Sequence, residues 1–164
     1  MLMNIHAQAS EGSAEASIRE YSQTFRELIA AAANVKAGIA GRDPNERGER
    51  RLLNLGHTFA HAIEKNSSEA IPHGQAVSMG IILAARLAES LGLTDGLSDR
   101  LKADFTACGL PVECPYSVDT LADAMKKDKK ADGAFVHFVL PLDIGNVETR
   151  ELRVEEAVSA LKDE

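Results

Sequence analysis

Histidine side chains gather in one short stretch of the sequence and are its strongest chemical signal. His57 and His61 lie four residues apart in a segment that we expect to be helical, so they share one face. His73 stands directly before the next predicted helix, and a short helical hairpin would bring it back towards that face. Three converging imidazoles are typical ligands of a divalent transition metal, zinc first. The alternative is that they are ordinary surface or core histidines.

A polar stripe extends this histidine pair. Its members follow one another at steps of four, three and four residues along one predicted helix: Arg50, Asn54, His57 and His61. Such a stripe is usually a solvated face, but a guanidinium, an amide and two imidazoles together suit an anion-and-metal site. The stretch lacks the Glu of H-E-x-x-H, which argues against a zincin protease. The lysine-rich run 126–130 is most simply the solvated end of a helix, and it could also supply an ammonium group for an anion.

Composition and charge limit the class of protein. The chain has 164 residues, of which 45% are hydrophobic and 26% charged, as in a globular domain. Its net charge of −7 argues against a general nucleic-acid binder, which would carry a basic face. No apolar run reaches the roughly 20 residues that span a bilayer, and residues 1–10 lack the cationic start of a secretory signal. Cys108 and Cys114 form no C-x-x-C pair. We therefore expect a cytoplasmic protein with reduced thiols and with neither nucleic-acid nor membrane partners.

Apolar residues recur at helical spacing through most of the chain. After a frayed first dozen residues, we expect helices over 17–36 (ended by Gly38, Gly41 and Pro44), 50–64, 74–91, 97–108, 118–127 and 154–161. Gly56, inside the second of these, suggests close approach of another backbone. Residues 134–140 and 147–153 predict two strands joined by a turn. The predicted fold is mainly α, a multi-helix bundle with a small antiparallel β-hairpin near the C-terminus, in a single domain over 1–164.

Several of these segments, in this order, resemble 3-dehydroquinate synthase of the sugar-phosphate cyclase superfamily. LNLGHTFAHAIE, at residues 53–64, resembles the signature helix of that family, and HGQAVSMG, at 73–80, resembles its second metal motif. Lys36, the pattern DxxExGxR at 43–50, the pattern DKKxxG at 128–133 and Ile144-Gly145 also match. Gln75 and Ala60 stand where the family often has Glu and Gly. The resemblance runs from about Lys36 to Gly145.

The resemblance implies a role for each matching residue. His57 and His73 would be the metal ligands, and His61 would sit beside the metal, contact the substrate and help to move protons. The substrate's carboxylate, hydroxyl and phosphate groups would be bound by Lys36, Arg50 and Asn54, which form the catalytic set with His61, and by Lys129 or Lys130.

The implied reaction converts 3-deoxy-arabino-heptulosonate 7-phosphate to 3-dehydroquinate and phosphate in the shikimate pathway. It is a carbon–oxygen lyase reaction that needs NAD and a divalent metal, zinc or cobalt, in a homodimeric enzyme. The family's NAD-binding domain and its third metal ligand, a Glu, would lie upstream, and residues 1–56 contain no Gly-rich nucleotide fingerprint.

We therefore expect a C-terminal domain that is inactive without its NAD-binding half and has no NAD-binding residues of its own. The alternatives are a domain of another sugar-phosphate cyclase, of the inosose or valiolone synthase type, and a non-catalytic helical module that keeps the family sequence.

Overall fold

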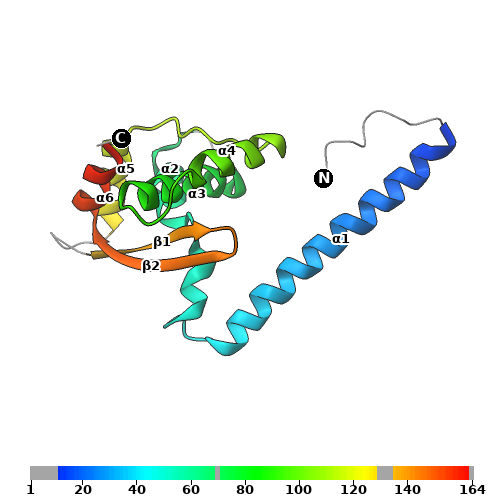
Figure 1. Cartoon of the computed structure of the whole chain (residues 1–164), viewed down its shortest axis with the longest axis horizontal. Helices are drawn as coiled ribbons and strands as arrows, with labels where there is room; N and C mark the ends of the chain where they lie inside the picture. Colours follow the sequence, from blue (N-terminus) through cyan, green and yellow to red (C-terminus); the bar gives the residue numbers. More distant parts are fainter. Residues whose placement is uncertain (1–10, 69–70, 129–134, 163–164) are drawn as a thin grey trace. The chain divides into compact units, whose positions relative to one another are not determined.

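The computed structural model describes residues 11–68, 71–128 and 135–162, and the chain divides into two compact units, Met1–Arg50 and Arg51–Glu164. In the described part of the first unit, helix α1 (Glu11–Arg42) is followed by a turn (Figure 1). α1 continues past Gly38 and Gly41, so the helix end predicted at these glycines is wrong. A glycine costs only about 1 kcal/mol inside a helix, whereas Pro44 disfavours helical backbone at the residue before it.

The apolar side of α1 is exposed. The large apolar side chains of this helix are between 41% and 66% exposed: Tyr21, Phe25, Leu28, Ile29 and Val35. None of residues 21–50 is buried, so this described part of the first unit does not cover these side chains.

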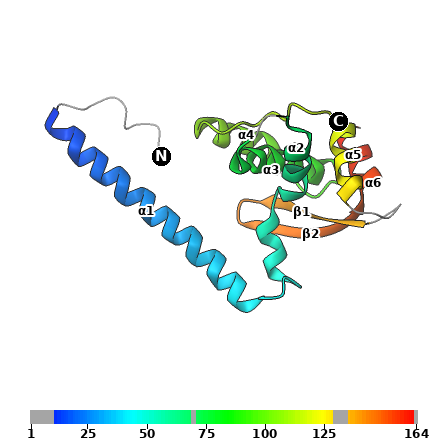
Figure 2. The same cartoon turned by 180° about the vertical axis from the view of Figure 1, so that it is seen from behind.

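The second unit is a helical bundle with one antiparallel hairpin, which confirms the predicted fold class. Its elements are α2 (His57–Asn66), α3 (His73–Ser90), α4 (Leu97–Ala107), α5 (Val118–Asp128), β1 (Phe135–Asp143), β2 (Asn146–Arg153) and α6 (Val154–Lys162). The 3-10 helix η1 (Glu49–Asn54) leads into it. Figures 1 and 2 show α5 and α6 at one end of this unit and α4 at the other.

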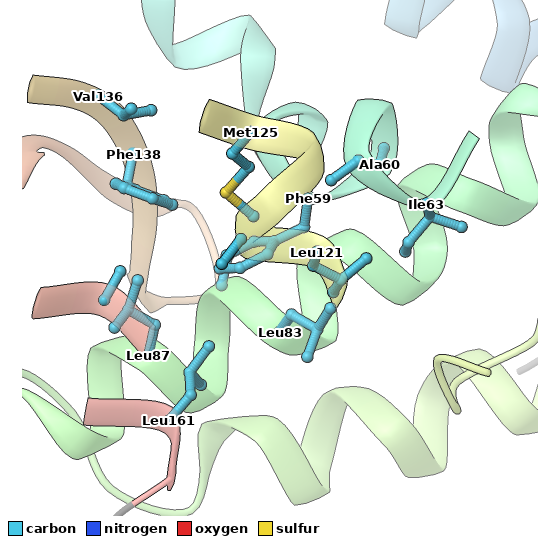
Figure 3. Close-up of a cluster of buried hydrophobic side chains, with 14 of the residues drawn as sticks. Phe59, Ala60, Ile63, Leu83, Leu87, Leu121, Met125, Val136, Phe138 and Leu161 are labelled. Carbon is cyan, nitrogen blue, oxygen red and sulfur yellow. The ribbon is translucent and has the colours of Figure 1, made fainter. Parts of the chain in front are cut away.

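Helix α3 forms the centre of the second unit, as its uniformly apolar sequence predicts. Ten of its residues are buried, and α2, α4, α6 and β1 pack against it. Figure 3 shows Leu83 and Leu87 of α3 among buried side chains of the surrounding elements. In the same cluster, the rings of Phe59 in α2 and Phe138 in β1 are 5.5 Å apart between centroids. Neither α3 nor any other helix in the described part of the chain is long and apolar enough to cross a membrane.

Two of the predicted helix boundaries are confirmed in atomic detail. Gly92 follows α3 with a φ of 67°, and the N–H groups of Gly92 and Leu93 donate to the carbonyls of Glu89 and Ala88. This pair of bonds is a Schellman cap. At the start of α5, the Ser117 hydroxyl accepts a hydrogen bond from the backbone N–H of Thr120 at 3.2 Å.

The segment predicted as one helix over 50–64 is interrupted at Gly56. η1 ends at Asn54 and α2 begins at His57, and Gly56 between them has a φ of 75°, in the left-handed region that favours glycine. The single-helix prediction is therefore wrong, because the spacing of side chains does not reveal a local change in backbone handedness.

The close approach predicted at Gly56 is confirmed, and its partner is Gly80 of α3. A Cβ atom at Gly80 would overlap the carbonyl oxygen of Gly56, and a Cβ atom at Gly56 would lie 2.7 Å from the backbone nitrogen of Ile81. Helices α2 and α3 therefore cross with their backbones in contact. This crossing holds the start of α2 against α3.

The hairpin of β1 and β2 closes the bundle on one side. Its two-residue turn contains Gly145 with a φ of 81°, and Phe138 and Leu140 point into the core. β1 runs past the predicted end at residue 140 because an irregularity in the register between Pro141 and Asp143 accommodates the proline.

We expect Gly80→Ala to destabilise the second unit, because its Cβ has no room against the Gly56 carbonyl. Overpacking of this kind typically costs about 1–3 kcal/mol of unfolding free energy. Urea unfolding followed by circular dichroism measures the loss.

Gly74→Ala is the matched control, because Gly74 lies in the same helix and its Cβ would meet nothing within 4 Å. We expect it to be neutral or slightly stabilising. Equal stabilities for the two variants would contradict a backbone contact at Gly80.

Candidate metal and substrate site

Three imidazole rings meet where α2 crosses α3. His57 is the first residue of α2, His61 lies one turn further along, and His73 is the first residue of α3. Their ring centroids are 5.2 Å apart for His57 and His73, 5.9 Å for His57 and His61, and 6.4 Å for His61 and His73. The structure therefore brings the three sequence-predicted histidines together.

Hydrogen bonds orient two of these rings. The Nδ1 atom of His57 lies 3.1 Å from the carbonyl oxygen of Leu55, and Nδ1 of His73 lies 2.9 Å from a carboxylate oxygen of Glu64. Both oxygens act as acceptors, so each Nδ1 carries a hydrogen, and in the neutral ring each Nε2 then keeps its lone pair. Metal-binding histidines are commonly oriented in this way, with a carbonyl or carboxylate holding the other ring nitrogen.

The spacing of His57 and His73 suits a shared metal ion. Two imidazoles bound tetrahedrally to one zinc ion have centroids about 5 Å apart, from the metal–nitrogen distance of about 2 Å and the size of the ring. The pair at 5.2 Å fits this value. No group of three His, Cys, Asp or Glu side chains in the described ranges is arranged to hold a metal.

His61 connects the imidazoles to a pocket beside them. A pocket of about 190 Å³ lies between α2, α5 and β1, and its lining includes Thr58, His61, Lys65 and His137. The Thr58 hydroxyl donates to the carbonyl oxygen of His137 at 3.2 Å, which ties α2 to β1 here. An exposed imidazole that lines a pocket together with a lysine suits contact with an anionic molecule.

The polar stripe of the sequence analysis is not one helix face. Because Gly56 turns the chain, Arg50 and Asn54 precede a break and do not continue the face of His57 and His61. Asn54 is the exposed last residue of η1. Lys36, which is exposed on α1, and Arg50 belong to the first unit. Lys129 and Lys130 lie outside the described residues.

Asp43 shapes the turn that leads to Arg50. Its carboxylate accepts hydrogen bonds from the backbone N–H groups of Arg47 at 3.0 Å, Gly48 at 2.8 Å and Arg50 at 3.1 Å. The Arg50 guanidinium donates to the carbonyl oxygen of Pro44 at 3.0 Å. The bonds from Arg47 and Gly48, with a smaller contribution from Arg50, hold the pKa of the Asp43 carboxyl below its ordinary value.

The sequence predicts no role for Asp43 or for Glu64. Asp43 was recognised only as part of a matching pattern, although Asp before a turn commonly binds nearby backbone N–H groups. Glu64 ends the signature segment and lies seven residues after His57 on the same helix. That spacing, two helical turns, is the signal that could have linked it to the histidines.

Known structures of an inosose synthase and a valiolone synthase have a similar fold. A 2-deoxy-scyllo-inosose synthase complexed with carbaglucose-6-phosphate, NAD⁺ and Co²⁺ matches with a TM-score of 0.68 at 18% identity, over 86% of this chain and 41% of that chain. The 2-epi-5-epi-valiolone synthase of Streptomyces hygroscopicus subsp. jinggangensis, with NAD⁺ and Zn²⁺ bound, matches with a TM-score of 0.68 at 25% identity, over 84% of this chain and 39% of that chain.

Sequence comparison defines the family more narrowly. The 3-dehydroquinate synthase of Pyrococcus abyssi is 41% identical over 138 residues, which cover 84% of this chain and 40% of the relative. Residues 4–131 match the family described as 3-dehydroquinate synthase C-terminal. The chain belongs to this family, and it spans about two fifths of the length of the curated relatives that it matches.

We expect the turn at 43–50 to respond to pH through Asp43. Because the carboxyl pKa is lowered in the folded chain, the carboxylate stabilises the turn fully above its unfolded value of 3.8. This stabilisation is lost only as the pH falls through the lower folded-state pKa. Amide chemical shifts of Arg47 and Gly48, followed by NMR from pH 6 downwards, should move with a midpoint below 3.8.

Asp43→Asn serves as the control, because an amide keeps an acceptor oxygen but does not titrate. The shift change should disappear in this variant. A midpoint at or above 3.8 in the unchanged chain would contradict the bonds to Asp43.

Proposed function

We propose that this chain is the metal- and substrate-binding part of a 3-dehydroquinate synthase. The complete enzyme would convert 3-deoxy-arabino-heptulosonate 7-phosphate to 3-dehydroquinate and phosphate, with an NAD-binding domain upstream of this one. The observation that carries the proposal is the pair of His57 and His73, whose rings are 5.2 Å apart with both Nδ1 atoms engaged. Relatives of this name are about 40% identical over most of the chain.

Two of the histidines would bind the metal, and the third would move a proton. His57 and His73 would hold a divalent ion, zinc or cobalt, through their Nε2 atoms. His61 lies next to both rings and borders the pocket, so it would contact the substrate and move a proton there. Imidazole suits this role because it gains and loses a proton near neutral pH.

The charged and amide groups would bind the ends of the substrate. Lys36, Arg50 and Asn54 would hold its carboxylate, hydroxyl and phosphate groups, and Lys129 or Lys130 would add a positive charge. Holding a charged substrate at several points lowers the entropic part of the barrier. The Asp43 turn would serve this step by fixing the backbone from which Arg50 extends.

When bound, the metal would polarise the substrate's hydroxyl and carbonyl oxygens, and NAD would accept and return a hydride. The residues of this chain would orient the substrate for both processes.

A second candidate function is favoured by the structural neighbours. Their inosose and valiolone synthase activities belong to the same fold, so this chain could serve a cyclase that acts on another sugar phosphate. A third candidate is a non-catalytic module that retains the family sequence.

We expect His57→Ala and His73→Ala each to remove zinc or cobalt binding by the chain. Isothermal titration measures this loss, and the unchanged chain should bind only weakly because it offers two ligands. His137→Ala is the control, since His137 lies on β1 and pairs with Glu151 rather than with these rings. Tight stoichiometric binding by the unchanged chain would contradict a two-ligand site, and no effect of His57→Ala would remove the main support for the enzyme.

A hybrid enzyme separates the candidate functions. Residues 1–164 would replace the matching part of the Pyrococcus abyssi relative, and phosphate release and products would be measured by NMR. We expect the hybrid to form 3-dehydroquinate, and Arg50→Ala in it to lower turnover by at least 100-fold through lost positioning, a magnitude on the order of that seen for misplaced substrates. A folded hybrid that turns over only another sugar phosphate would favour the second candidate, and one that binds no metal would favour the third.

A further inference from the structure

Glu64 connects the two helices that carry the candidate ligands. It lies near the end of α2, and its carboxylate oxygen is 2.9 Å from Nδ1 of His73 at the start of α3. The Glu64 side chain is 31% exposed and that of His73 is 57% exposed. A partly exposed pair of this kind contributes only about 0–1 kcal/mol to stability. Stability alone is therefore a weak reason for this contact.

The two candidate ligands are oriented by different means. The ring of His57 is held by the main-chain carbonyl of Leu55, which belongs to its own chain segment. The ring of His73 is more than half exposed and is held by a side chain from the other helix. Without that side chain, the His73 ring would be free to rotate and to carry its hydrogen on either nitrogen.

We propose that Glu64 is a positioning residue that fixes the ring and tautomer of His73 for metal binding. This inference rests on the proposed metal centre. By accepting the Nδ1 hydrogen, Glu64 leaves the Nε2 lone pair available on a ring whose centroid is 5.2 Å from that of His57, and its negative charge makes the imidazole a stronger donor. Glu64 itself is not a ligand, because it occupies the Nδ1 side of the ring and the metal would lie on the Nε2 side.

The test is the Co²⁺ affinity of the full 164-residue chain, measured by isothermal titration, together with the absorption spectrum of the bound cobalt. We expect Glu64→Ala to weaken binding by about 10–100-fold, the usual effect of losing such a partner. Glu64→Gln keeps an acceptor oxygen for the Nδ1 hydrogen, so it should restore part of the affinity and leave the cobalt spectrum unchanged.

Glu113→Ala is the matched control, because the Glu113 side chain is 81% exposed and lies in a loose ion pair with Lys102 at 3.7 Å. It should leave the affinity and spectrum unchanged. Thermal unfolding of every variant, followed by circular dichroism, separates a loss of metal affinity from a loss of fold.

The outcomes distinguish this inference from the proposed function. If Glu64→Ala lowers only the melting temperature and leaves cobalt affinity unchanged, the positioning role is overturned and the metal centre stands. If Glu64→Gln is as weak as Glu64→Ala and alters the cobalt spectrum, Glu64 is a direct ligand and the inference is overturned. If the unchanged chain binds no Co²⁺ at all, the metal centre and the role of Glu64 are both overturned.

Discussion

The contact between the backbones of Gly56 and Gly80 is the constraint on which the candidate site depends. No side chain separates α2 from α3 at this point, so the distance between the two helices is set by main-chain atoms alone. His57 follows Gly56 directly, and His73 begins the helix that contains Gly80. A bulkier residue at either glycine would push the helices apart and would separate the imidazoles, and it would also stretch the bond between Glu64 of α2 and His73 of α3.

The buried core makes this crossing rigid. Phe59 and Ile63 of α2 point into the same buried cluster as Leu83 and Leu87 of α3. His57 is half-buried, and His61 and His73 are exposed. Dense packing in the cluster resists small shifts of the helices. The arrangement therefore combines a fixed spacing between ligands with access from solvent, which a site for a small charged molecule requires.

The sequence predicted the parts of this structure that depend on local chemistry. Helix ends at Gly92 and Ser117, the apolar α3 and the hairpin all follow from caps, spacing and turn residues. The sequence did not predict the interruption at Gly56. The apolar residues on both sides keep helical spacing, although the backbone at Gly56 adopts a left-handed conformation. α1 continues through Gly38 and Gly41 because a glycine opposes a helix mainly through its conformational entropy. The helix ends at Arg42, two residues before Pro44.

In the candidate site, too, some features follow from local sequence and others depend on how the helices pack. The convergence of His57, His61 and His73 could be inferred from their positions on two adjoining helices. The bond from His73 to Glu64 could not, because it depends on how the end of α2 meets the start of α3. Arg50 and Asn54 do not continue the helix of His57 and His61, because the backbone turns at Gly56 between them.

The Asp43 turn changes how the pattern DxxExGxR should be interpreted in distant sequences. One carboxylate satisfies three main-chain donors there, so the aspartate is required for architecture whether or not the arginine binds anything. A lineage that abandoned catalysis would be free to lose the arginine and the imidazoles while selection for folding preserved the aspartate. The presence of the aspartate therefore reports on the fold of the turn, and only the accompanying arginine and histidines carry information about chemistry.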